Sequence, residues 1–181
     1  MKLGKSSSIA SFSGCSTMAL ALVMLLGIAC TKQSPTYKEQ VKTALEQADL
    51  KDVSVSEDVA NRTITLSGTL HSEESKEKAD EIARANAGKE TVANEIGVEP
   101  IGSESAARGV ASNQDDAIEK NYKAALISKG LDKQHIHYDA KNGVLTLKGS
   151  VKDTNERAQA EELAQNTPNV RQVLNQISVQ R

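Results

Sequence analysis

The side chains that could do chemistry in this chain are few: three histidines, two cysteines and a run of carboxylates. His135 and His137 stand at positions i and i+2, so on a strand both would lie on one face, a spacing that metal sites sometimes use. No cysteine and no third histidine stands near them in the sequence. We therefore predict an ordinary exposed pair and no metal site.

Carboxylates are concentrated between residues 73 and 81, where they alternate with Lys76 and Lys78 and are followed by Arg84. Charges of both signs at helical spacing are more typical of a solvated helix face than of an acid–base pair. No serine stands in a G-x-S-x-G turn. We predict no catalytic residues, no cofactor and no enzymatic activity.

Cys30 ends an apolar run, Met18 to Ala29, that follows two N-terminal lysines. The run has twelve residues, whereas a membrane-spanning helix needs about 20. A basic start, a short apolar run and small residues before a cleavage point are typical of a secretory signal peptide. Cys15 also follows small residues, but no apolar run precedes it.

The segment Gly27-Ile28-Ala29-Cys30 resembles the lipobox of bacterial lipoproteins, with Gly27 where leucine is usual. The resemblance implies that residues 1–29 are a cleaved signal peptide. Cys30 would then carry thioether-linked acyl chains such as palmitate, and residues 30–35 would form a lipidated tether. Two acyl chains give stable anchoring where one gives marginal binding. A free thiol after an ordinary signal peptide, or an uncleaved anchor, is the alternative.

The residue after Cys30 is Thr31. By resemblance to Gram-negative lipoproteins, the absence of aspartate at this position implies sorting to the outer membrane. The expected location is therefore the periplasmic face of that membrane, with the protein anchored through the lipidated Cys30.

The rest of the chain contains an internal duplication. Adding 81 to a position in the first copy gives its counterpart in the second without a gap. Identical pairs include Leu50 with Leu131, Gly68 with Gly149, Ala79 with Ala160, and Asn94 with Asn175. The match predicts one domain at 36–99 and another at 115–181, joined by a small, polar, flexible linker at 100–114.

Each copy has the pattern of a helix, two strands, a helix and a strand. Apolar residues at helical spacing open each copy, around 41–48 and 118–126. Two alternating segments follow, with turn residues at Asn61 and at Asn142-Gly143 between them. Ser72 and Asp153 stand where the second helix needs an N-cap. The predicted fold is α+β: two tandem αββαβ domains, each a small three-stranded sheet with two helices packed on one face.

The strand-plus-glycine patterns at 64–70 and 144–151, each followed by an alanine-rich helix and an alternating strand, resemble the BON domain (bacterial OsmY and nodulation). This family consists of small periplasmic αββαβ modules. A lipidated cysteine followed by two such units is similar to the dual-BON outer-membrane lipoproteins of the OsmY/DolP-like group. The resemblance implies contact with phospholipid and a role in envelope integrity or osmotic stress.

Gly68 and Gly149 are the glycines of these patterns. A glycine at the end of a strand usually serves a turn, a bulge or a close approach of two backbones. We predict that both are structural turn glycines.

Charge and composition restrict the partners. The formal net charge is −2, so the chain has no excess of basic residues to bind phosphates. It has four aromatic residues and no tryptophan, so few side chains could stack on bases. We therefore expect no nucleic-acid binding. The two copies differ. The first has 8 basic and 14 acidic residues, net −6, and the second has 10 and 9, net +1. An anionic membrane surface would repel the first copy only.

The opening helix of the second copy carries Lys120, Lys123 and Ile127 on the face opposite its buried stripe, at 100° per residue. The first copy has two glutamates and one lysine at the matching positions. An outward isoleucine beside two lysines suits a helix that contacts lipid headgroups. We predict that these three residues contact anionic phospholipid. A single exposed isoleucine among solvated lysines is the alternative.

The leading hypothesis is a non-catalytic, lipid-anchored periplasmic protein that contacts anionic phospholipid through its second BON domain and supports envelope integrity or osmotic stress tolerance. The alternative is a protein-interaction module that docks on an envelope assembly without binding phospholipid directly. A third hypothesis, ion or solute sensing, rests only on scattered carboxylates and on His135 and His137.

Overall fold

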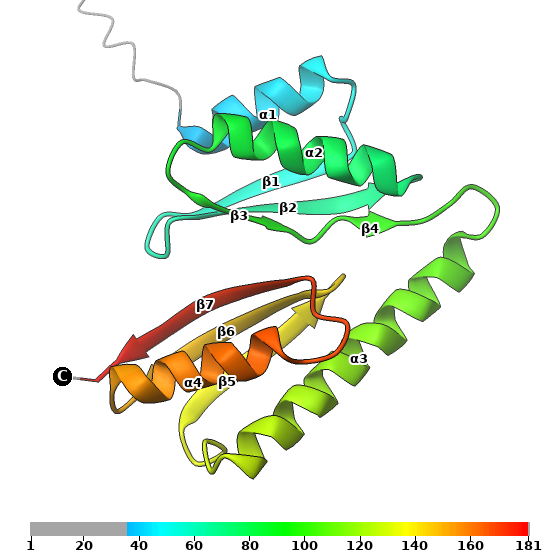
Figure 1. Cartoon of the computed structure of the whole chain (residues 1–181). Helices are drawn as coiled ribbons and strands as arrows, with labels where there is room; N and C mark the ends of the chain where they lie inside the picture. Colours follow the sequence, from blue (N-terminus) through cyan, green and yellow to red (C-terminus); the bar gives the residue numbers. More distant parts are fainter. Residues whose placement is uncertain (1–35, 181) are drawn as a thin grey trace, which may run out of the picture. The chain divides into compact units, whose positions relative to one another are not determined.

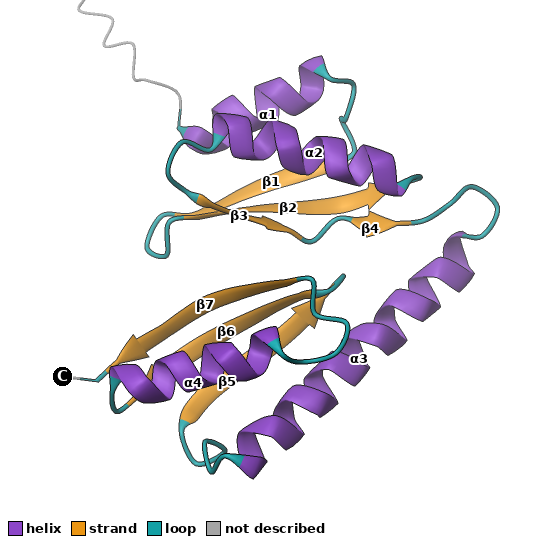
Figure 2. Cartoon of the chain, in the orientation of Figure 1, coloured by secondary structure: helices purple, strands orange, loops and turns teal. Residues whose placement is uncertain are grey.

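A computed structural model describes residues 36–180 of the chain (Figures 1 and 2). The predicted signal peptide at 1–29, the tether at 30–35 and Cys30 itself lie outside the described residues. The described residues belong to one compact unit. Within the described residues, no helix is both long enough and apolar enough to cross a bilayer.

The first domain is built around a central strand. Its elements are α1 (Tyr37–Gln47), β1 (Val53–Asp58), β2 (Thr63–Leu70), α2 (Glu73–Asn86), β3 (Thr91–Asn94) and β4 (Gly97–Val98). Strand β2 pairs antiparallel with β1 and parallel with both β3 and β4. Figure 1 shows α1 and α2 on the same face of this sheet.

The second domain repeats the arrangement. Its elements are α3 (Glu104–Ser128), β5 (His135–Lys141), β6 (Val144–Val151), α4 (Thr154–Gln165) and β7 (Gln172–Val179). Strand β6 is central, with β5 antiparallel and β7 parallel to it. The structure confirms the predicted α+β fold of two tandem αββαβ domains.

The duplication is visible in the element boundaries. Strand β6 begins and ends 81 residues after β2, and α4 begins 81 residues after α2. One difference is in the last strand, which is continuous in the second copy but interrupted between β3 and β4 in the first. The interruption falls at Glu95, whose carbonyl oxygen accepts a hydrogen bond from the side chain of Asn142 at 2.8 Å.

The segment 100–114 differs from the flexible linker that the sequence suggested. Helix α3 begins at Glu104 and continues without a break to Ser128, so most of this segment is helical. Two contacts fix it. The Arg108 guanidinium donates two hydrogen bonds of 2.9 Å to the Glu99 carboxylate. The carboxylate of Asp115 accepts from the backbone N–H groups of Asn142 and Gly143.

Each domain has one hydrophobic core, between the sheet and its two helices. The predicted stripe of α3 is confirmed, because Ile118, Tyr122 and Leu126 are buried. The predicted caps are confirmed as well: the side chain of Ser72 accepts from the N–H of Ser75, and that of Asp153 accepts from two N–H groups at the start of α4. The buried residues of these two cores lie between 41 and 177.

Gly68 and Gly149 lie within β2 and β6, two residues before each strand ends, rather than at the strand ends. Their φ angles are +116° and +111°. A Cβ atom would collide with the carbonyl oxygen of Asp52 at Gly68 and with that of His135 at Gly149. Only glycine accommodates both the backbone angle and the close approach.

We expect Gly149→Ala to destabilise the second domain by about 1–3 kcal/mol, because the new methyl group meets backbone that cannot move aside. This corresponds to a fall in melting temperature of roughly 4–24 °C for a domain of this size. Gly109→Ala in α3 is the matched control. Nothing lies within 4 Å of the added Cβ there, so helix propensity should raise stability by about 0.5–1 kcal/mol. Equal changes in stability for Gly149→Ala and Gly109→Ala would contradict a structural requirement for glycine at position 149.

Candidate functional site

The predicted lipid-contact residues lie together on the exposed face of α3. Lys120 and Lys123 are exposed, and Ile127 is 55% exposed. Neither lysine forms an ion pair or a side-chain hydrogen bond with any residue of the described part of the chain. We call Lys120, Lys123 and Ile127 the lysine–isoleucine face. Its charges are available to an outside partner.

The matching face of α1 in the first domain has different chemistry. There the Nζ atom of Lys42 lies 4.0 Å from Oε1 of Glu46, which is one turn further along α1. Glu46 occupies the position in α1 that Ile127 occupies in α3. The stretch 120–134 has four lysines and one aspartate, net +3, while its counterpart at 39–53 has two lysines and four acids, net −2. The same fold therefore presents faces of opposite charge.

A cavity of about 280 Å³ opens beside the lysine–isoleucine face, under the C-terminal end of α3. It is lined by Lys123, Leu126, Ile127, Leu131, Asp132, Gln134, Ile136 and Tyr138. Sequence reasoning missed this cavity. The available signal was the comparison of the copies, because Gln134 and Tyr138 stand where the first copy has Val53 and Glu57.

Two tyrosines hold α3 in place behind the cavity. The rings of Tyr122 and Tyr138 meet edge to face, with centroids 5.2 Å apart. The Tyr122 hydroxyl donates to the carbonyl oxygen of Ala160 on α4 at 3.2 Å. Burial raises the pKa of both phenols, and the carboxylate of Glu119 adds to the effect at Tyr138. Glu119 itself accepts from the N–H of Ala140 on β5 at 3.0 Å.

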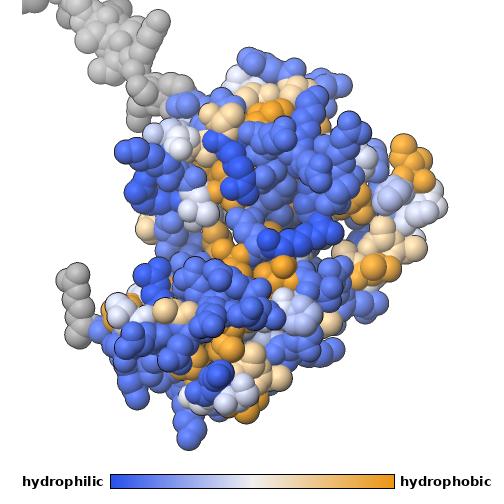
Figure 3. Space-filling model, viewed as in Figure 1, coloured by the Kyte–Doolittle hydropathy of each residue, from blue (hydrophilic) through white to orange (hydrophobic). Residues whose placement is uncertain are grey.

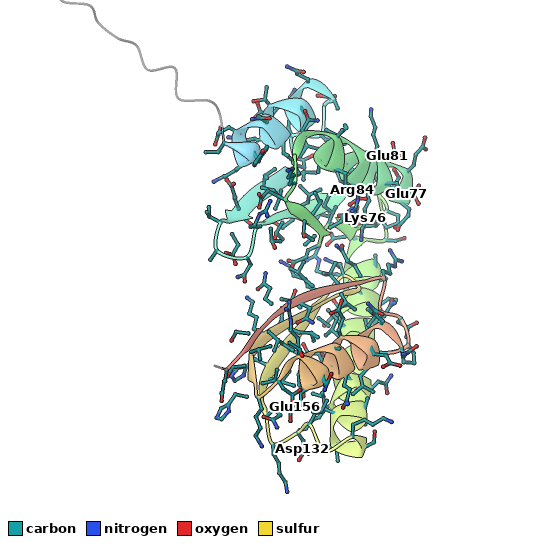
Figure 4. The ribbon with its side chains drawn as sticks, turned by 60° about the vertical axis from the view of Figure 1, so that its left-hand side comes forward. Lys76, Glu77, Glu81, Arg84, Asp132 and Glu156 are labelled. Atoms are coloured by element: carbon teal, nitrogen blue, oxygen red, sulfur yellow. The ribbon has the colours of Figure 1, made fainter. Side chains whose placement is uncertain are left out.

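One carboxylate lines the cavity, that of Asp132, and a second, Glu156, is bound to the lining residue Gln134. Glu156 accepts from the Gln134 side chain at 3.0 Å and from the N–H of Lys152 at 2.9 Å. Asp132 is exposed in the loop after α3, and Figure 4 shows it at the same end of the second domain as Glu156. Lysines therefore outnumber unengaged carboxylates at this end of α3, and the face is suited to an anionic partner.

The two histidines singled out by the sequence lie on β5, and both are exposed. Within residues 36–180, no group of three or more potential metal ligands is assembled. Nothing in this part of the chain brings a third ligand to the pair.

The described residues form two tandem αββαβ domains, and the second carries an exposed helix face with two lysines. A model of the BON domain matches residues 35–100 and 114–181. The chain belongs to the BON-domain family, as the repeated glycine patterns predicted. This family is generally non-catalytic, and it suggests an envelope protein that interacts with phospholipid or with protein.

The other comparisons add little. A search of curated proteins found no match. Two solved structures of CdsD, a structural protein of the type III secretion system of Chlamydia trachomatis, align at 15% and 16% identity, with TM-scores of 0.33 and 0.32. They cover 77% and 80% of this chain, which spans 62% of theirs. Similarity at this level carries no functional argument.

We expect Tyr122→Phe to destabilise the second domain by about 1 kcal/mol at neutral pH, because the hydrogen bond to Ala160 is lost. Tyr138→Phe is the control, since its hydroxyl has no hydrogen-bond partner among the described residues. The substitution should also change the pH dependence. The pKa of Tyr122 is raised in the folded state, so its contribution is complete below the unfolded value of about 10 and is lost as the pH rises above it.

Thermal unfolding between about pH 8 and pH 11 measures both effects, the range being chosen around the unfolded pKa of tyrosine. Tyr122→Phe should lose less stability across this range than the unmodified chain. An identical alkaline loss would show that the Tyr122 phenol does not couple to folding.

Proposed function

We propose that this protein is a lipid-anchored periplasmic protein that contacts anionic phospholipid through the lysine–isoleucine face of α3, without catalysis. The observation that carries the proposal is the combination of two unpaired lysines with an exposed isoleucine on one helix face. In this proposal the acylated Cys30 holds the chain at the outer membrane, and the second domain meets the headgroups.

The energies fit a weak contact that depends on the anchor. A lysine near an anionic surface contributes about 1 kcal/mol. Burying the exposed half of Ile127 contributes about 1 kcal/mol more. Without tryptophan the face has no strong interfacial anchor. Two acyl chains would supply stable attachment, and a tethered weak contact then benefits from a high effective concentration.

The first domain has a different part in this proposal. Its net charge of −6 and its Lys42–Glu46 pair give no attraction to an anionic surface. We assign it the role of a spacer or a partner-binding unit. Support of envelope integrity or osmotic tolerance would follow from the contact of the second domain with the membrane.

Vesicle co-sedimentation of a chain beginning at residue 31 tests the phospholipid contact. We expect pelleting with vesicles that contain anionic phospholipid and little with neutral ones. Replacing Lys120 and Lys123 by glutamine removes about 2 kcal/mol, roughly a thirtyfold loss of affinity. Ile127→Asp should also reduce pelleting. Lys42→Gln on α1 is the matched control and should have no effect.

Equal pelleting with neutral and anionic vesicles, or no change with Ile127→Asp, would refute the phospholipid contact. Crosslinks to an envelope protein that persist when Lys120 and Lys123 are neutralised would support the alternative of a protein-interaction module.

The anchor is tested separately in cells. Cys30→Ser removes the thiol that would be acylated, so we expect the protein to move from the membrane fraction to the soluble periplasmic fraction. Cys15→Ser should leave fractionation unchanged. If the protein with Cys30→Ser stays in the membrane fraction with residues 1–29 removed, acylation of Cys30 is not what anchors it.

A further inference from the structure

A groove of about 320 Å³ lies between α2, β4 and the N-terminal half of α3, away from the lysine–isoleucine face. Its apolar lining comes from Ile96, Val98, Pro100, Ala107, Val110 and Ala111. Lys76 of α2 also lines this groove, which we call the Lys76 groove. Figure 4 shows Lys76 on the underside of α2, with Glu77 and Glu81 on the outer side of the helix.

Lys76 is unusual because its side chain is almost wholly buried while its ammonium group has no partner among the described residues. The residue is only 7% exposed. Its ammonium group makes no hydrogen bond and no ion pair with any described residue. Burial lowers the pKa of Lys76, which reflects the cost of keeping the ammonium charged away from water. Buried charges in proteins are ordinarily paired, so this side chain calls for an explanation.

The three carboxylates whose charges act on Lys76 are those of Glu73, Asp80 and Asp115, and each is engaged with another group. Glu73 pairs with Arg171 at 2.8 Å. Asp80 accepts two hydrogen bonds from Arg84.

The carboxylate of Asp115 is likewise occupied, by the backbone N–H groups of Asn142 and Gly143 at 2.8 and 3.0 Å. With these three acids engaged, Lys76 is left as the one unpaired cation lining this groove, within the part of the chain that the structure describes.

The mouth of the groove is apolar. Val110, which lines the groove, is 66% exposed, and Ile101, next in the chain to the lining residue Pro100, is 80% exposed. Figure 3 shows hydrophobic atoms at the outer tip of the connection between β4 and α3, on a mostly hydrophilic face. Six apolar residues, together with polar groups that include Lys76, line a volume of about 320 Å³, which is the size of a small-ligand site.

We propose that the Lys76 groove binds a small amphiphilic carboxylate, with its apolar chain along the groove and its single negative charge on the Lys76 ammonium. One ammonium matches one negative charge, whereas a dianionic phosphate would also meet the carboxylates of Glu73 and Asp115. This site shares no residue with the lysine–isoleucine face, so it is independent of the proposed membrane contact.

The test is a titration of the chain from residue 31 with octanoate, followed by backbone amide chemical shifts. Octanol and acetate are the matched probes, because octanol keeps the chain without the charge and acetate keeps the charge without the chain. We expect octanoate to shift amides around Ile96, Val98 and Ala107, and to bind about tenfold more tightly than octanol. Acetate should bind more weakly than either.

Lys76→Met keeps the apolar stem and removes the charge, and it should abolish the preference for octanoate over octanol. Lys78→Met, at an exposed position of the same helix, should leave the preference intact. We expect Lys76→Met to fold, since replacing a buried charge by an apolar side chain is often neutral or stabilising. Val110→Asp, at an exposed position of the groove lining, is a second test variant. It should weaken the binding of octanoate more than the binding of octanol, because the new carboxylate repels the anion.

Equal binding of octanoate and octanol would overturn the proposal, as would shifts confined to residues outside the groove. Retention of the preference by both Lys76→Met and Val110→Asp would overturn it too. None of these outcomes bears on the vesicle experiment, because Lys76 and Val110 are not part of the lysine–isoleucine face.

Discussion

The architecture depends on the close approach of the second helix of each domain to the sheet, at two alanines one turn apart. Ala79 and Ala83 in α2, like Ala160 and Ala164 in α4, are fully buried. Larger side chains there would hold the helix away from the central strand. With these small residues in one helix, the first helix supplies the large core side chains, such as Leu45 or Tyr122. The outer face of this first helix does not pack against the core.

This division explains how one fold can carry two kinds of surface. Folding constrains the buried stripe of the first helix and the glycines of the central strand, and these positions match between the copies. It does not constrain the outer face. There the first domain has an internal ion pair at Lys42 and Glu46, while the second has unpaired lysines and Ile127. The difference between the copies is therefore a difference in what their outer faces can contact.

Much of this could be read from the sequence because it depends on periodicity and on local chemistry. The ungapped repeat, the buried stripe of α3, the caps at Ser72 and Asp153 and the exposure of Lys120, Lys123 and Ile127 all follow from spacing within one element. The helical state of 104–114 did not follow, because the contacts that fix it, Arg108 with Glu99 and Asp115 with the β5–β6 turn, join residues from different elements. The unpaired state of Lys76 is hidden for the same reason, since a sequence shows charges of both signs around it without showing which of them pair.

Helix α3 joins the two candidate sites within one rigid element. It has 25 residues, or about 37 Å at 1.5 Å per residue. Its first half lines the Lys76 groove through Ala107, Val110 and Ala111, and its last turns carry the lysine–isoleucine face. A flexible linker at 100–114 would have left the groove without a wall, because three of its apolar residues would have no fixed place. The ion pair of Arg108 with Glu99 and the bonds from Asp115 thus do more than order a connection: they complete a binding surface that neither copy of the repeat contains alone.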